Sequence, residues 1–265
     1  MKHDLIIRGG KLVTANETYN ADIGIKDGRI ATLGEDLDGN EIINADKKLV
    51  MPGGIEAHCH IAQESANGIM TSDDYETGSI SAAFGGNSCF VPFAAQKKGE
   101  SIASTIAEYD RRAETKSVID YSYHLILTDP NENVMNELPS AFERGITSFK
   151  VFMTYATRVS DAQFLDILTI ARRHGGLTMV HAENHDMLSW MSNALTQAGY
   201  TEPRYHAPAR PSLAEEEAIN RAISLSKLAN APLMIVHVST PKGAELVARA
   251  RMDGAFVFGE TCPQY

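Results

Sequence analysis

The sequence predicts an α/β protein in which a small β unit precedes most of a (β/α)8 barrel. The first 52 residues read as short strands and turns without helical periodicity. From Gly53 onward, seven apolar runs alternate with longer amphipathic segments. These runs lack the in-out alternation of half-exposed strands, which is typical of parallel strands buried on both faces. An open doubly wound sheet is the alternative, but no Gly-x-Gly-x-x-Gly follows an early strand.

The N-terminal unit, residues 1–52, is expected to be a small antiparallel sheet. Asp27-Gly28 separates two apolar runs and is a strong hairpin signal. The expected strands cover residues 4–7, 11–14, 21–26, 29–33 and 41–44. The pattern changes after Pro52 from short strands and turns to alternating apolar and amphipathic segments, so the domain boundary is expected there.

The barrel is expected over residues 53–265. Its strands are predicted at residues 54–58, 88–93, 118–127, 148–154, 178–182, 233–238 and 256–260. Helices are predicted at residues 75–84, 101–114, 134–144, 161–174, 186–198, 213–228 and 242–252. The acidic run Glu215–Glu217 opens one of these helices, where negative charge is favourable, and is given no other role. Because seven of eight strands are present, the barrel is expected to be truncated in this chain.

Composition narrows the classes of partner. The chain has 265 residues, 24 Lys and Arg against 34 Asp and Glu, and a net charge of −10. Without a basic cluster, neither nucleic acid nor an anionic membrane surface is an expected partner. The longest apolar run is too short to span a bilayer, and the charged N-terminus does not resemble a signal peptide. Three widely separated Cys suggest free thiols, so a cytoplasmic location is expected.

The strongest chemical signal is the pair His58 and His60. Residues two apart in a strand point to the same side, so both imidazoles converge at the end of the first barrel strand. The C-terminal ends of the strands are where barrel enzymes carry out their chemistry. Neutral imidazole is a good zinc ligand, which makes this pair a candidate metal site. The alternative is a pair of His near a surface loop.

Lys150 stands in the middle of an apolar strand run. Burial lowers the pKa of an amine, and a neutral amine can combine with carbon dioxide to form a carbamate with two anionic oxygens. Such a group could bridge two cations. The alternatives are a Lys that extends to the strand end or one that pairs with a carboxylate.

His181 and His237 end two further apolar runs, and Tyr155 follows the strand of Lys150. Either His alone would be read as a hydrogen-bonded core residue. Together with His58, His60 and Lys150, they predict two metal ions that share an anion and a hydroxide. Tyr155 could donate to a developing oxyanion or simply pack in its loop.

Taken together, the motifs resemble the amidohydrolase superfamily, and within it the dihydropyrimidinase/D-hydantoinase family of cyclic amidases. The resemblance covers essentially the whole chain. It rests on Asp-Leu-Ile-Ile-Arg-Gly-Gly-Lys-Leu-Val near the N-terminus, Leu-Val-Met-Pro-Gly-Gly-Ile at the barrel entry, Ser-Asp-Asp-Tyr-Glu-Thr-Gly-Ser, Ser-Phe-Lys with Tyr155, Val-His-Ala-Glu-Asn and the final Glu-Thr-Cys-Pro-Gln-Tyr.

The resemblance implies two divalent metals, with zinc expected. His58 and His60 would bind one, His181 and His237 the other, and carbamylated Lys150 would bridge them. Tyr155 would act in catalysis and substrate binding.

It also implies a small cyclic amide substrate, a homotetramer, and an N-terminal unit that forms part of a composite β-sandwich. The family usually has Asp where this chain has Glu56, so that second-sphere contact must be made differently.

Other activities in the superfamily remain as alternatives. Dihydroorotases typically have Arg where this chain has Ala62, so that activity is disfavoured. An allantoinase-like ureide hydrolase and a catalytically inactive scaffold protein stay open. The loops at residues 61–72 and 156–160 are expected to line the exocyclic group of the substrate.

Overall fold

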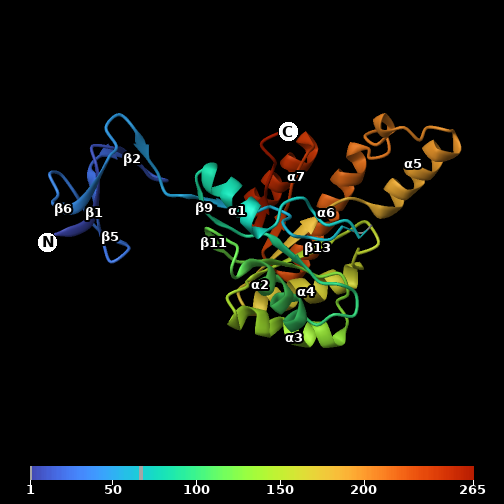
Figure 1. The fold of residues 1–265 in the computed structure, drawn as a ribbon. Coiled ribbons are helices and arrows are strands. Elements are labelled where there is room, and N and C mark those ends of the chain that lie inside the picture. Colours follow the sequence, from blue (N-terminus) through green and yellow to red (C-terminus); the bar gives the residue numbers. More distant parts are fainter. Residues whose placement is uncertain (1, 66–67) are drawn as a thin grey trace. The chain divides into compact units, whose positions relative to one another are not determined.

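A computed structural model describes residues 2–65 and 68–265 of the chain. It forms two compact units, Met1–Gly54 and Ile55–Tyr265. The division lies two residues from the boundary expected after Pro52. Each unit is described by itself below (Figure 1).

The regular elements within residues 2–54, the described part of the first unit, are all strands. These are β1 (His3–Arg8), β2 (Lys11–Val13), β3 (Thr18–Asn20), β4 (Asp22–Lys26), β5 (Arg29–Gly34), β6 (Gly39–Asn44) and β7 (Leu49–Val50). One sheet has the order β5-β4-β1-β6, and a second has the order β3-β2-β7. Ile6, Leu12 and Ile23 form the buried apolar interior.

The expectation of a purely antiparallel unit was wrong. β1 pairs antiparallel with β4 but parallel with β6, and β2 pairs parallel with β7. The β4–β5 hairpin occupies one edge of β1, so β6 crosses to the other edge and runs beside β1 in the same direction. A strand buries the same side chains whether its neighbour runs parallel or antiparallel to it. The sequence periodicity therefore does not show which of the two pairings forms. The short strands β3 and β7 were also missed.

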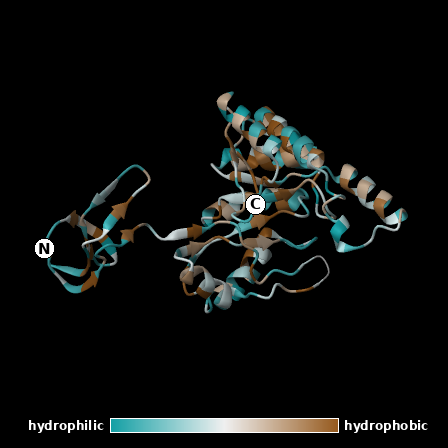
Figure 2. Ribbon diagram, turned by 90° about the horizontal axis from the view of Figure 1, so that it is seen from above, coloured by the Kyte–Doolittle hydropathy of each residue, from teal (hydrophilic) through white to brown (hydrophobic). Residues whose placement is uncertain are grey.

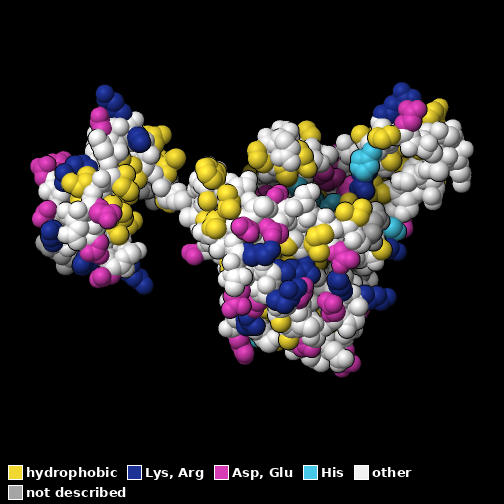
Figure 3. All heavy atoms as spheres, in the orientation of Figure 1, with side chains coloured by type: hydrophobic (Ala, Val, Ile, Leu, Met, Phe, Trp, Pro, Cys, Tyr) yellow, Lys and Arg dark blue, Asp and Glu magenta, His cyan; other side chains and the backbone are white. Residues whose placement is uncertain are grey.

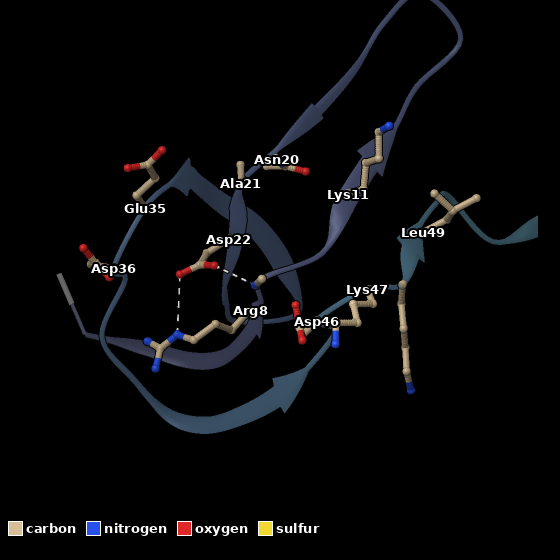
Figure 4. A pocket seen from close by; sticks show the side chains of 12 residues that line it. Arg8, Lys11, Asn20, Ala21, Asp22, Glu35, Asp36, Asp46, Lys47 and Leu49 are labelled. Atoms are coloured by element: carbon tan, nitrogen blue, oxygen red, sulfur yellow. Dashed lines mark hydrogen bonds and ion pairs between the residues drawn. The ribbon is translucent and has the colours of Figure 1, made fainter.

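A charged cleft of about 630 Å³ lies in this unit (Figure 4). Asp22 is buried there and accepts a hydrogen bond from the Gly9 N–H at 2.9 Å. The Arg8 guanidinium lies 3.5 Å from the same carboxylate. None of the predicted metal ligands lines this cleft.

The second unit contains parallel strands at all seven predicted positions. They are β8 (Gly54–Glu56), β9 (Asn87–Phe90) with β10 (Phe93–Ala95), β11 (Asp120–Tyr121) with β12 (His124–Ile126), β13 (Ser148–Phe152), β14 (Leu177–His181), β15 (Leu233–Ile235) and β16 (Val257–Gly259). Two hydrogen-bonded sheets, β11-β9-β8 and β10-β12-β13-β14-β15-β16, follow the order of the chain. Pro92 separates β9 from β10, because it has no N–H to donate to a neighbouring strand.

An α-helix follows each strand position except the last, and a short 3-10 helix and a second α-helix are added after β14. The helices are α1 (Tyr75–Phe84), α2 (Ile102–Ala113), α3 (Glu132–Glu143), α4 (Asp161–Arg173), α5 (His185–Gln197), η1 (Pro203–Tyr205), α6 (Ser212–Ala229) and α7 (Pro241–Met252). Side chains cap several N-termini, as Asp74 and Ser160 do in complete capping boxes. In contrast, α5 projects from this unit and buries only Leu188 (Figure 1). No helix of the described residues is long and apolar enough to cross a membrane.

The apolar residues of the second unit form two layers. The main cluster lies between strands and helices and includes Phe149 and Val151 of β13. A smaller cluster inside the strands contains Phe93 and Met179, with Phe152 packed against it. Because neighbours in a strand alternate in direction, Lys150 faces the same side as Phe152. Brown, apolar residues lie on the central strands of this unit and alternate with teal and white residues along its helices (Figure 2).

Candidate active site

The four predicted His meet at one end of the strands. His58 and His60 follow β8, His181 is the last residue of β14, and His237 lies two residues after β15. Ring centroids are 5.7 Å apart for His58 and His60, 5.5 Å for His58 and His237, and 4.7 Å for His181 and His237. This end of parallel strands is the functional face of barrel enzymes. Figure 3 shows histidine and acidic side chains within a recess of this unit.

Three of the four rings have one nitrogen held by an acceptor oxygen. His58 Nδ1 donates to Glu260 Oε2 at 2.8 Å, and His60 Nδ1 donates to Gln63 Oε1 at 2.6 Å. His181 Nε2 donates to Glu183 Oε2 at 2.6 Å. In neutral imidazole, each bond leaves the other ring nitrogen unprotonated, and that of His181, Nδ1, faces His237 Nε2. An N–H fixed on an oxygen is the usual arrangement around a metal-binding His.

The spacing of His181 and His237 also fits a shared cation. His181 Nδ1 and His237 Nε2 lie 3.1 Å apart. Two nitrogens bound tetrahedrally at zinc distances would be about 3.3 Å apart. Among the described residues, no three His, Cys, Asp or Glu side chains converge as a complete ligand cage. The fit therefore rests on pairs of imidazoles and on Lys150.

Burial favours the neutral form of two of the imidazoles, His60 and His237. The pKa of His237 is lowered to about 3, chiefly by burial and also by the neighbouring His181, Lys150 and His58. Burial also lowers the pKa of His60, although its hydrogen bond with Gln63 opposes this. Neutral imidazole is the form that binds metal, so burial favours the ligating state of these two rings.

Lys150 is buried inside the strands and is only 1% exposed. Its Nζ lies 4.8 Å from the ring centroid of Phe93 and 5.0 Å from that of Phe152. It forms no salt bridge with any carboxylate of the described residues. The pKa of Lys150 is lowered to about 7 by burial, which outweighs the opposing effect of the Glu260 carboxylate. Lys150 therefore neither reaches solvent nor pairs with an acid, and a large fraction of it is a neutral amine at pH 7.

Tyr155 lies beside the His cluster. Its ring centroid is 5.1 Å from that of His181, and the residue is 40% exposed. Tyr155 and His237 both adopt positive φ, at 69° and 39°. Such conformations are strained for residues with a side chain and are often found at functional sites.

Sequence reasoning missed the ring partner of His58. Glu56 Oε1 accepts from the backbone N–H of His58 at 2.9 Å, so it holds the main chain and leaves the ring to Glu260. The position of Glu260 at the end of the seventh apolar run was the available signal. Glu215 was expected only to open a helix, but it has a further role. Its Oε1 accepts hydrogen bonds from the N–H groups of Ser239 and Thr240, at 3.0 Å each. It thereby holds the loop that follows His237.

No protein-family model matches the chain. It is 43% identical to D-hydantoinase from Geobacillus stearothermophilus over 98% of its length, and 35% identical to dihydropyrimidinase from Rattus norvegicus over 97%. The matched regions cover 56% and 51% of those proteins. The chain thus spans just over half the length of these relatives.

Solved structures agree with the sequence matches. Dihydropyrimidinase from Brevibacillus agri superimposes with a TM-score of 0.95 at 43% identity, covering 100% of this chain and 58% of that one. The chain belongs to the hydantoinase/dihydropyrimidinase family. L-Hydantoinase from Arthrobacter aurescens, a more distant relative, still gives a TM-score of 0.89 at 27% identity, covering 99% of this chain and 59% of that one. Membership in this family confirms the resemblance drawn from the motifs and the α/β fold class.

Proposed function

We propose that the protein hydrolyses a cyclic amide, opening a dihydropyrimidine or a 5-substituted hydantoin to the N-carbamoyl amino acid. The observation that carries this proposal is the arrangement of three imidazoles. Each has one nitrogen held by an acceptor oxygen, and all lie at the end of the strands that contain the buried Lys150. The names of the relatives support the same chemistry.

The ligand chemistry suits two divalent ions, with zinc the preferred metal. His58 and His60 would hold one ion, and His181 and His237 the other. The neutral amine of Lys150 would add to carbon dioxide, forming an N–C bond and releasing a proton, and the resulting carbamate would supply anionic oxygens to both ions. When bound, the ions supply a hydroxide near neutral pH and polarise the ring carbonyl.

Tyr155 supplies a proton donor next to this centre. Its phenol would donate to the oxyanion that develops on the ring carbonyl and would orient the ring. Burial raises the pKa of Tyr155, although Arg210 opposes this, so the phenol stays protonated at neutral pH. Glu260 and Glu183 keep the rings of His58 and His181 in their orientations.

The exocyclic group of the substrate would occupy a cavity of about 990 Å³ next to Tyr155. Gln63 and Glu64 of one predicted loop line this cavity, as do Ala156 and Thr157 of the other. Residues 66–67 of the first loop lie outside the described residues. A cavity of this size accommodates a bulky substituent.

The finer architecture and assembly form part of the same proposal. The seven parallel strands would belong to a (β/α)8 TIM-type barrel that forms the hydrolase domain at 53–265. Residues 1–52 would belong to a composite β-sandwich. We propose a cytoplasmic homotetramer. Light scattering of the purified full-length protein measures this assembly, and a monomer would contradict it.

Chelation tests the mechanism. The full-length protein is assayed on dihydrouracil, a 5-substituted hydantoin and allantoin, before and after removal of metal. We expect about two metal equivalents per chain, and loss of ring opening on chelation that added zinc restores. Turnover that survives complete chelation would contradict the mechanism. Turnover of allantoin alone would favour the ureide hydrolase, and absence of both metal and turnover would favour a scaffold protein.

The variant Lys150→Ala separates the bridge from the other ligands. We expect it to lose most of its bound metal, measured by elemental analysis. An intact metal content would show that no carbamate bridge is needed.

A further inference from the structure

A continuous chain of contacts joins Tyr155 to His181. His181 Nε2 donates to Glu183 Oε2 at 2.6 Å, and Arg210 Nη1 donates to the same oxygen at 2.5 Å. The guanidinium carbon of Arg210 lies 5.4 Å from the ring centroid of Tyr155. Arg210 thus contacts both the acid that holds a candidate ligand and the candidate oxyanion donor.

Arg210 reaches this position from outside the strands. It lies two residues before α6, in the segment that returns from the projecting α5 through η1. With Tyr155, Glu183 and His237 it lines a cavity of about 310 Å³. The side chains of Arg210 and Glu183 are 28% and 17% exposed, so the pair is partly screened from water.

We propose that Arg210 is a positioning residue that holds Glu183 against His181 and Tyr155 against the reaction centre. A single carboxylate oxygen accepts from both His181 and Arg210, so the guanidinium limits the rotation of Glu183. An arginine over an aromatic ring also stabilises that ring by a cation–π contact. Tyr155 needs such support, because tertiary contacts must hold a residue at positive φ.

The role of Arg210 in turnover rests on the proposed function. Its role in holding Glu183 and Tyr155 rests on geometry alone. Together these roles predict that a change at Arg210 affects two properties together, the retention of metal by His181 and the contribution of Tyr155 to turnover. A residue with only a structural role would lower both in proportion to the fraction of folded protein.

The test compares Arg210→Gln and Arg210→Lys with Arg204→Gln in the full-length protein. Arg204 is the matched control, since it lies in the same segment but pairs with Glu202 and stacks on Tyr205. We expect Arg210→Gln to weaken zinc retention against a chelator by about 10- to 100-fold, as loss of outer-sphere partners generally does. The kcat should fall by a similar factor with little change in KM. Arg210→Lys, which keeps a cation for Glu183, should recover most of the zinc retention.

A third readout does not depend on metal or turnover. Ring ¹⁵N NMR of the metal-free protein reports which nitrogen of His181 carries the proton, with signals assigned through His181→Gln. We expect the preference for Nε2–H to weaken in Arg210→Gln and to persist in Arg204→Gln. Equal His181 tautomers and equal zinc retention in these two variants would overturn the inference, even if the wild-type protein opens rings. An inactive wild-type protein would overturn the proposed function, while the tautomer comparison would still decide the role of Arg210.

Discussion

Replacing Lys150 with Met should stabilise the metal-free protein while removing the proposed bridging ligand. The Met side chain has a volume similar to that of Lys and places no amine next to the rings of Phe93 and Phe152. The pKa of Lys150 is lowered from 10.5 to about 7 by burial. Since one pKa unit corresponds to about 1.4 kcal/mol, this burial lowers the free energy of unfolding by up to about 5 kcal/mol. Lys150→Met should recover on the order of 4 kcal/mol of this at pH 7.

Proton binding by Lys150 determines how this stability difference changes with pH. Between pH 7 and 10.5 the unfolded chain holds a proton on Lys150 that the folded chain lacks, so the wild-type protein gains stability as pH rises through this window. The Met variant has no such group. The difference between the two proteins should therefore be large at pH 7 and small at pH 10.

Urea unfolding measures the difference in bicarbonate-free buffer containing a chelator, at pH 7 and pH 9.5. Lys48→Met is the control, because Lys48 is exposed. We expect a higher midpoint for Lys150→Met at pH 7, a smaller gain at pH 9.5 and no comparable change in the control. Equal midpoints for wild type and Lys150→Met at pH 7, or a gain that does not shrink with pH, would refute the reasoning.

Three further changes test individual contacts. Glu260→Ala removes the acceptor from His58 Nδ1 and should weaken metal affinity by about 10- to 100-fold in chelator competition; unchanged affinity would argue against this contact. Tyr155→Phe should lower kcat by about 10²- to 10³-fold with a smaller change in KM, and a loss below threefold would exclude the phenol as oxyanion donor. Gly78→Ala would place a Cβ 2.6 Å from Ile61 Cδ1, so thermal unfolding should report a loss of about 1–3 kcal/mol; an unchanged melting temperature would contradict this packing.

Much of this protein can be predicted from local patterns. Apolar runs without alternation identify the parallel strands, and His58 and His60 are recognisable as a pair of imidazoles close to the end of the first of them. Lys150 is recognisable because an amine in an apolar run is unusual. These features depend on residues close together in the chain, whose directions follow from helix and strand periodicity.

Contacts between elements that lie far apart in the sequence could not be predicted. Glu260 bonds to a His 202 positions earlier in the chain, and Arg210 reaches Glu183 from a segment that no periodicity describes. The parallel pairing of β1 with β6 could not be predicted either, because parallel and antiparallel pairing bury the same faces of the strands. The sequence alone therefore determined which side chains stand at the strand ends. Only the tertiary structure decided which acids and which arginine hold them, since those partners are brought together by packing and not by spacing along the chain.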